Sequence, residues 1–171
     1  GEKKKAVQKT NINCASYESA SYEFVPIEHT GLKSYEGNGF VIRNLAVTQA
    51  SSSTKTAAAL FAGTKDMKIS DVRMVNASVR ASGGKPVAVL AGRAENTVFE
   101  GCQVYWESIA GSFNLRGLLG DSSRGYRYQV QGDGEAGGLA GILDGENNEI
   151  KNCLGSNLND GVTEGGLIRK H

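Results

Sequence analysis

Aromatic and guanidinium side chains are concentrated between residues 105 and 128, and their types suit the recognition of a sugar. Aromatic faces with hydrogen-bond donors nearby are what a sugar-binding surface needs. In Tyr126-Arg127-Tyr128, alternation places both tyrosines on one side of a strand. The alternative interpretation is that some of these aromatics cover the core beneath an expanded loop. The candidate glycan-binding residues are Tyr105, Trp106, Arg124, Tyr126, Arg127 and Tyr128.

Acidic and amide side chains form a second group between residues 133 and 149. Hard oxygen ligands in a polar loop suit calcium, and the candidate ligands are Asp144, Glu146 and Glu149, without the spacing of an EF-hand. The same stretch could supply the carboxyl pair of a polysaccharide-cleaving enzyme, if adjacent coils place two carboxyl groups ~5 Å or ~6.5–9.5 Å apart. A solvated turn is the simpler interpretation. No cofactor other than calcium is indicated.

Several combinations that common enzymes need are missing from the sequence. His29 and His171 are its only histidines, so no Ser-His-Asp, Cys-His or metal-His set can be assembled around them. The glycine-rich run 137–141 is followed neither by Gly-Lys-Ser/Thr nor by a helical pattern, which argues against a phosphate loop. A lyase that uses arginine, lysine and acidic groups is the enzymatic alternative to a binding module.

The charge balance limits the class of partner. Lysine and arginine number 19 against 18 aspartates and glutamates, so no global field attracts nucleic acid or an anionic membrane surface. No apolar run is long enough for a transmembrane helix, so no membrane span is expected.

A repeated pattern must position all of these side chains. A run of small residues ending in glycine is followed by a polar turn and a short β-rich run, and such units are anchored at Gly63, Gly92, Gly120 and Gly141. A period of roughly 20 to 30 residues without helical periodicity predicts a solenoid of stacked strands. We therefore expect an all-β parallel β-helix of about six coils. Residues 24–171 would form it, with residues 1–23 as an N-terminal cap or extension.

Corners and narrow places of each coil should select particular residues. Asn44, Asp71 and Asn152 are expected at corners, where their side chains can hydrogen-bond to backbone. Small residues are needed where coils stack at about 4.8 Å around a narrow corner. Their expected positions are Ala58, Ala62, Ala88, Ala91, Gly117, Gly137, Gly138 and Ala140.

Cysteine spacing bears on cross-linking. Cys102 and Cys153 occupy the same place in their units, and the unit at Gly120 lies between them in the sequence. That places them two coils, ~9.6 Å, apart, beyond the ~7 Å limit for a disulfide. We therefore expect buried free thiols, and Cys14 is assigned to no coil.

The repeat carries a family resemblance. Gly137-Gly138-Leu139-Ala140-Gly141 with Glu149-Ile150-Lys151-Asn152-Cys153 resembles the GLUG repeat of bacterial surface proteins, and residues 35–45 resemble its usual lead-in. The resemblance covers about residues 22–168 and departs from the pattern at 124–130. It implies a right-handed β-helix on a secreted or cell-surface protein, often an adhesin, a glycan-associated protein or the accessory region of an immunoglobulin-A-cleaving metallopeptidase. It implies no catalytic residue.

A non-enzymatic module for adhesion or glycan binding, extracellular or on the cell surface, is therefore the leading functional expectation. Its partner would be a glycan or a host surface protein. The alternatives are a peptidase accessory region, a polysaccharide-cleaving β-helix and a rigid spacer. Because the chain starts without methionine and ends in an opened coil, we expect a piece of a larger protein and an end-to-end contact through the uncapped C-terminal coil.

Overall fold

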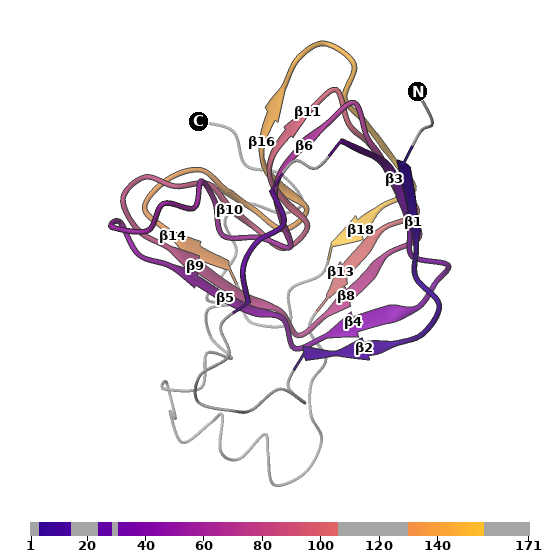
Figure 1. Cartoon of the computed structure of the whole chain (residues 1–171), viewed down its shortest axis with the longest axis horizontal. Coiled ribbons are helices and arrows are strands. Elements are labelled where there is room, and N and C mark those ends of the chain that lie inside the picture. The colour runs from indigo at the N-terminus through magenta and orange to yellow at the C-terminus, as the bar shows by residue number, and fades with distance from the viewer. Residues whose placement is uncertain (1–3, 15–23, 29–30, 106–129, 156–171) are drawn as a thin grey trace, which may run out of the picture.

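The computed structural model describes residues 4–14, 24–28, 31–105 and 130–155, and its regular elements in these ranges are β-strands. Successive coils of the chain stack on one another, and each coil adds one strand to several parallel sheets (Figure 1). The prediction of an all-β parallel β-helix is confirmed.

Five sheets, named A to E, make up the walls of the solenoid. Sheet A contains, in order, β1 (Lys4–Val7), β3 (Leu32–Glu36), β7 (Lys68–Ser70), β12 (Val98–Glu100) and β17 (Glu149–Lys151). Sheet B contains β2 (Ile12–Asn13), β4 (Val41–Arg43), β8 (Arg73–Val75), β13 (Gln103–Tyr105) and β18 (Leu154–Gly155). Sheet C contains β6 (Phe61–Lys65), β11 (Ala91–Glu95) and β16 (Ala140–Asp144), and sheet D contains β5 (Ala46–Gln49), β9 (Ser78–Ala81) and β14 (Val130–Gly132). Sheet E contains β10 (Val87–Ala88) and β15 (Ala136–Gly137).

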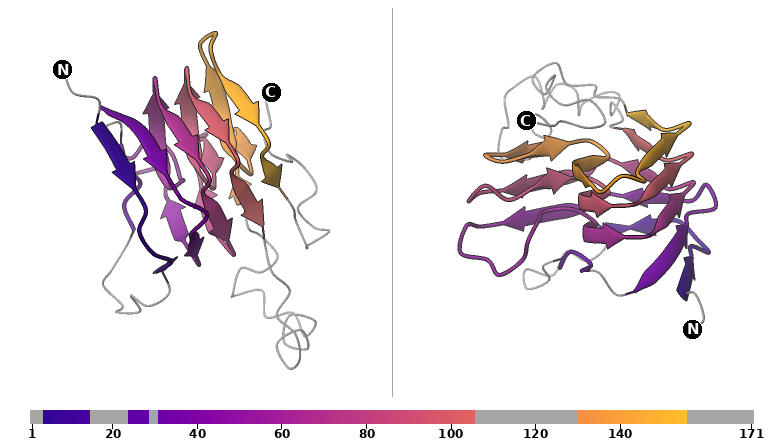
Figure 2. Two further views of the ribbon diagram at one scale, coloured as in Figure 1. Left: turned by 90° about the vertical axis from the view of Figure 1, so that its right-hand side faces the viewer. Right: turned by 90° about the horizontal axis from the view of Figure 1, so that it is seen from above.

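The solenoid is right-handed. Viewed along its axis from the N-terminal end, the chain runs clockwise from β3 through β4 and β5 (Figure 1). The side views show the later coils lying progressively farther along the axis, away from that viewer (Figure 2). A clockwise path that recedes from the viewer is a right-handed helix, as the resemblance implied.

Pairing register shows which units are neighbours in the stack. Lys68 in β7 pairs with Val98 in β12, and Val98 pairs directly with Glu149 in β17. Sheets B and C repeat this direct pairing of the coil that contains β11–β13 with the coil that contains β16–β18. The separate coil expected at Gly120 therefore does not lie between them, and that interpretation of the sequence is wrong. Five levels cross sheet A in the described ranges, close to the six expected.

This register also corrects the expected distance between two cysteines. Gln103 pairs with Leu154, and the amide of Leu154 donates a 2.9 Å hydrogen bond to the carbonyl oxygen of Cys102. Cys102 and Cys153 therefore lie on adjacent coils, not two coils apart. Cys102 is buried and Cys153 is half-buried.

The N-terminal segment adds one strand each to sheets A and B beside the first coil. β1 pairs with β3 and β2 pairs with β4, both in parallel. Gln8, between the two strands, is buried and donates from Nε2 to the carbonyl oxygens of Thr10 at 2.9 Å and Val41 at 3.3 Å. Its Oε1 accepts a hydrogen bond from the Tyr35 hydroxyl. Residues 4–14 thus belong to the stack as a further level of sheets A and B.

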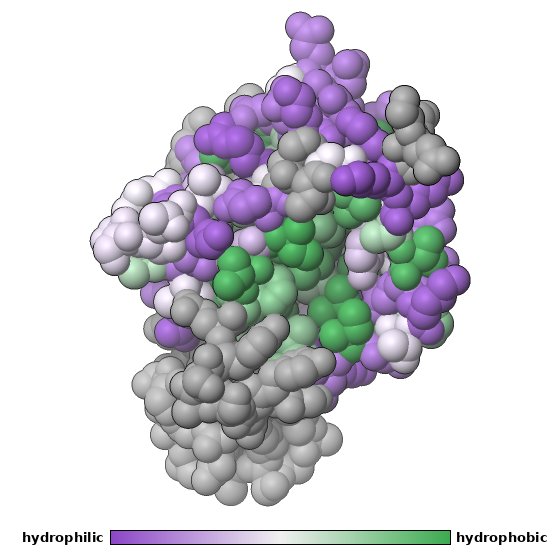
Figure 3. Space-filling view, viewed as in Figure 1, coloured by the Kyte–Doolittle hydropathy of each residue, from purple (hydrophilic) through white to green (hydrophobic). Residues whose placement is uncertain are grey.

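Inward-facing side chains form rows along the axis. In sheet A, Tyr35, Ile69, Phe99 and Ile150 stack in register, and the side chains of Ile69 and Phe99 are fully buried. The Tyr35 ring packs edge-on against Phe61 with ring centroids 5.9 Å apart. Along the axis from the N-terminal end, a space-filling view shows apolar residues at the centre of the section, with polar residues around them (Figure 3).

Corners and narrow places follow the expected residue types. The non-glycine residues with positive φ in the described ranges are all asparagine or aspartate: Asn38, Asn44, Asp66, Asp71, Asn76, Asn96 and Asn152. These two residue types tolerate the left-handed conformation better than others do, so the predicted corners at Asn44, Asp71 and Asn152 are confirmed. The expected small residues Ala58, Ala62, Ala88, Ala91 and Ala140 are all buried. Gly117 lies outside the described ranges.

Candidate functional site

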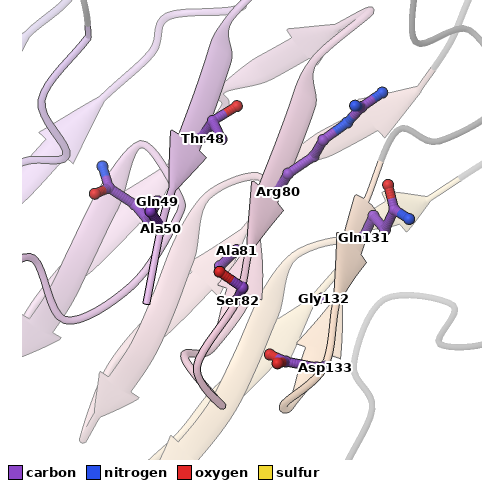
Figure 4. A pocket seen from close by; sticks show the side chains of 9 residues that line it. All are labelled: Thr48, Gln49, Ala50, Arg80, Ala81, Ser82, Gln131, Gly132 and Asp133. Carbon is purple, nitrogen blue, oxygen red and sulfur yellow. The ribbon is translucent and has the colours of Figure 1, made fainter. Parts of the chain in front are cut away.

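A row of polar side chains follows the outer surface of sheet D. Thr48 on β5 pairs with Arg80 on β9, and Arg80 pairs with Gln131 on β14. The residues just before Thr48 and Arg80, Val47 and Val79, are buried in the core. Because neighbouring side chains of a strand point to opposite faces, Thr48, Arg80 and Gln131 project outward together, as the close-up shows (Figure 4).

A shallow depression of about 440 Å³ lies over this row. Within the part of the chain that the structure describes, the Nε of Arg80 is buried and has no hydrogen-bond partner. Buried polar groups in folded proteins nearly always have a partner, so a buried guanidinium nitrogen without one is unusual. The lining residues are Thr48, Gln49, Ala50, Arg80, Ala81, Ser82, Gln131, Gly132 and Asp133.

One end of the depression is held by Asp133. Its carboxylate accepts hydrogen bonds from the backbone amides of Gly83 at 3.0 Å and Gly84 at 2.9 Å. The amide of Gly84, followed by that of Gly83, lowers the pKa of this carboxyl below its usual value. Asp133 therefore ties the end of β14 to the turn after β9 and is a charged acceptor already engaged with backbone.

A long insertion enters the solenoid beside this face. Arg43, Val75 and Tyr105 are equivalent by register at the ends of their sheet B strands. Val47, Val79 and Val130 are equivalent in sheet D. The first coil joins these positions through residues 44–46 and the second through 76–78, whereas the third uses residues 106–129. The insertion therefore replaces one short corner, with both ends anchored on regular strands.

The predicted glycan-binding residues map onto this insertion and its edge. Tyr105 ends β13, is half-buried, and its carbonyl oxygen accepts a 3.0 Å hydrogen bond from the amide of Asn76. The other five residues, Trp106, Arg124, Tyr126, Arg127 and Tyr128, lie outside the described ranges.

The predicted calcium ligands stand on or beside the turn between β16 and β17. Asp144 forms an ion pair with Arg93, and Glu149 pairs with Lys151 at 2.9 Å. Glu146 is exposed in the turn. Across residues 4–14, 24–28, 31–105 and 130–155, no group of three histidine, cysteine, aspartate or glutamate side chains is arranged to hold a metal ion.

The acidic residues between 133 and 149 do not form one group. Asp133 follows β14 in the left-hand lobe of the section, whereas Asp144 ends β16 at its upper end (Figure 1). The carboxylates considered for polysaccharide cleavage are thus divided between several walls of the solenoid: Asp133 follows a strand of sheet D, Asp144 lies in sheet C and Glu149 in sheet A.

Sequence reasoning missed Thr48, Arg80 and Gln131. A signal was present, because each of them directly follows a valine at an equivalent position of its coil: Val47, Val79 and Val130. The insertion separates the third valine from the pattern that precedes it, so these valines cannot be aligned by their distance along the chain.

No family model, curated protein or solved structure matches this chain. Among the residues that the structure describes, no helix is long and apolar enough to cross a membrane. What can be said of function therefore depends on the geometry of the solenoid and on the residue types along its walls.

Proposed function

We propose that this chain is a non-enzymatic, glycan-binding β-helix module of the GLUG type, belonging to an extracellular or cell-surface protein. Its ligand lies along the outside of sheet D, over Thr48, Arg80 and Gln131, and extends toward the insertion 106–129. The observation that carries the proposal is Arg80, which lines the depression and whose buried Nε has no partner in the described ranges.

The row on sheet D has the chemistry that sugar hydroxyls require. Thr48 offers a hydroxyl group, Arg80 a fork of donors, and Gln131 both a donor and an acceptor. In parallel strands these groups repeat about every 4.8 Å, which suits an extended chain of sugars. They stand on hydrogen-bonded strands, so little backbone conformational entropy is lost when a ligand binds.

Residues 106–129 supply the aromatic groups of the proposed surface. Trp106, Tyr126 and Tyr128 offer faces for sugar rings, and Arg124 and Arg127 add donors. Insertions mounted on a rigid scaffold are common places for binding residues.

Binding is favoured over cleavage by the state of the carboxylates. Asp133 holds two backbone amides, Asp144 pairs with Arg93, and Glu149 pairs with Lys151. A general acid must carry a proton near neutral pH, but the hydrogen bonds to Asp133 favour its ionised form and lower its pKa. These three carboxylates are therefore engaged with backbone amides or basic side chains of the solenoid itself.

A glycan array probed with the purified chain and an Arg80→Ala variant tests the proposal. Losing a hydrogen bond to a charged group costs roughly 1.5–3 kcal/mol, so Arg80→Ala should raise the Kd for the bound glycan by about tenfold or more. Arg73→Ala is the matched control, because Arg73 is an exposed arginine on β8 of sheet B. Equal affinities of the two variants would contradict the assignment to sheet D. No binding by the native chain would favour a rigid spacer instead.

A second variant separates the insertion from the strand row. Residues 106–129 are replaced by Asn-Ala-Ser, the sequence that joins Val75 to Val79 in the coil below. We expect circular dichroism to show a folded β protein, because the register of β13 and β14 already matches that of β8 and β9. We also expect weaker glycan binding, since the aromatic residues are removed. Unchanged affinity would restrict the site to sheet D.

A further inference from the structure

Two cysteines stand next to each other on the last two described levels of sheet B. Each immediately precedes its strand, β13 or β18, and follows a residue with positive φ, Gly101 before Cys102 and Asn152 before Cys153. The 2.9 Å hydrogen bond from Leu154 N to Cys102 O fixes the register between them. Paired residues of neighbouring parallel strands are separated by about 4.8 Å, within the range of ~4.4–6.8 Å that Cα atoms show across a disulfide.

Both thiols point toward the same row of the core. Cys102 is fully buried, and its Sγ lies 3.5 Å from the carbonyl oxygen of Ile69, to which it can donate. Cys153 packs against the same core cluster and is only half-buried. The two side chains therefore stack one above the other, with one accessible from outside and the other enclosed.

We propose that Cys102 and Cys153 form an intrachain disulfide that joins the coil containing β13 to the coil containing β18. The oxidant is a low-molecular-weight disulfide. The Cys153 thiolate attacks one sulfur of that disulfide, which releases one small thiolate and leaves a mixed disulfide on Cys153. Cys102 then loses its proton and attacks the Cys153 sulfur, which releases the second small thiolate. Two protein thiols are oxidised, and one small disulfide is reduced to two thiols.

The environment of the two sulfurs sets the order of these steps. The neighbouring Cys102 side chain stabilises the Cys153 thiolate and lowers the pKa of Cys153 to about 7. The same contact, followed by burial, raises the pKa of Cys102. Because the thiolate is the nucleophile and Cys153 is the more exposed of the two, Cys153 reacts first and Cys102 resolves the mixed disulfide.

The disulfide would close a covalent loop around the insertion, which the hydrogen bonds between strands do not do. Cys102 precedes the insertion 106–129 and Cys153 follows it, so the disulfide closes the loop that contains the insertion. It joins β18 covalently to the level that contains β13, the strand with which β18 pairs. An oxidising environment, such as the one proposed for this protein, favours its formation.

Peptide mapping of the wild-type chain tests the bridge. The protein is incubated with oxidised glutathione, blocked with iodoacetamide and digested with trypsin, which releases Cys102 in peptide 94–116 and Cys153 in peptide 152–169. We expect these two peptides to be found linked, and the intact chain to lose two hydrogens with no glutathione attached. A Cys14→Ser variant should behave identically, because Cys14 takes no part.

Three outcomes would overturn the proposal: a linkage through Cys14, a disulfide between two chains, or a glutathione adduct that persists on Cys153. Cys102→Ser and Cys153→Ser variants check the order of reaction. Cys102→Ser should accumulate the glutathione adduct, because the resolving thiol is missing, whereas Cys153→Ser should stay largely unmodified. The reverse pattern would contradict the assigned roles, and the wild-type linkage does not depend on how either variant folds.

Discussion

Arg80 and Asp133 line the same depression, but their polar atoms are satisfied in opposite ways. The carboxylate of Asp133 accepts two backbone hydrogen bonds, whereas the Nε of Arg80 is buried with no partner in the described ranges. Asp133 therefore contributes to the stability of the turn that it ties down. Arg80 therefore has a donor that the described residues do not use, and it is the residue on which the proposed binding depends.

The pKa of Asp133 predicts a pH-dependent contribution to stability. Its folded-state pKa lies below the unfolded value of about 3.9, so its contribution is present above that value and is lost as pH falls through the folded pKa. An Asp133→Asn variant should therefore have a lower Tm than wild type at neutral pH. This difference should shrink on acidification below about pH 4.

Thermal melts of both chains across this pH range measure the effect. Glu146→Gln is the control, because it removes an exposed carboxylate from the β16–β17 turn without touching the turn at Gly83 and Gly84. Melting curves for Asp133→Asn that stay parallel to wild type at every pH would show that these hydrogen bonds do not favour the ionised form.

At the scale of elements, the sheets depend on close approach between neighbouring backbone segments. Gly92 on β11 is the clearest case in sheet C. A Cβ atom there would overlap the side chain of Ala57 and lie 2.9 Å from the carbonyl oxygen of Ala62. The glycine is required by space at this position, and its conformational freedom does not enter the argument.

Gly92→Ala should destabilise the solenoid by about 1–3 kcal/mol, because the overlapping atoms belong to the buried wall of the previous coil and have little room to move. Urea unfolding measures the loss. Gly63→Ala is the matched control on the adjacent strand β6, where a Cβ would meet only the Arg93 carbonyl oxygen at 3.8 Å, an ordinary contact. We expect that variant to stay within about 0.5 kcal/mol of wild type. Equal losses of stability in Gly92→Ala and Gly63→Ala would mean that the coils can move apart at Gly92 to make room for a methyl group.

At the scale of the whole molecule, each coil is stabilised by the coils beside it. The outer faces add exposed ion pairs between levels, such as Lys68 with Glu100 at 2.9 Å and Lys65 with Glu95 at 3.7 Å, which contribute little individually. Stability along a solenoid is close to a sum over neighbouring units, so the outermost levels unfold most readily. A covalent link between two coils therefore adds directly to the coupling between those neighbouring units.

Oxidation of Cys102 and Cys153 should raise the free energy of unfolding. Closing a loop of this length lowers the entropy of the unfolded chain by an amount worth about 4 kcal/mol, less any strain in the folded state. Urea unfolding of the oxidised and reduced wild-type chain measures the difference. Cys153→Ser should unfold at the same urea concentration in both buffers, and a similar shift in that variant would attribute the effect to something other than the bridge.

The sequence by itself determined the type of fold and its corners. Asparagine and aspartate tolerate the left-handed conformation, and alanine fits between closely stacked coils, so Asn44, Asp71 and Ala91 could be placed from local chemistry. The tertiary structure alone decided which units are neighbours, because the hydrogen bonds between coils join residues far apart in the chain. An insertion such as 106–129 changes the sequence distance between Cys102 and Cys153, or between Arg80 and Gln131, without changing their places in the stack. The members of each pair are therefore far apart in the sequence, whereas the register of the sheets places them on adjacent strands.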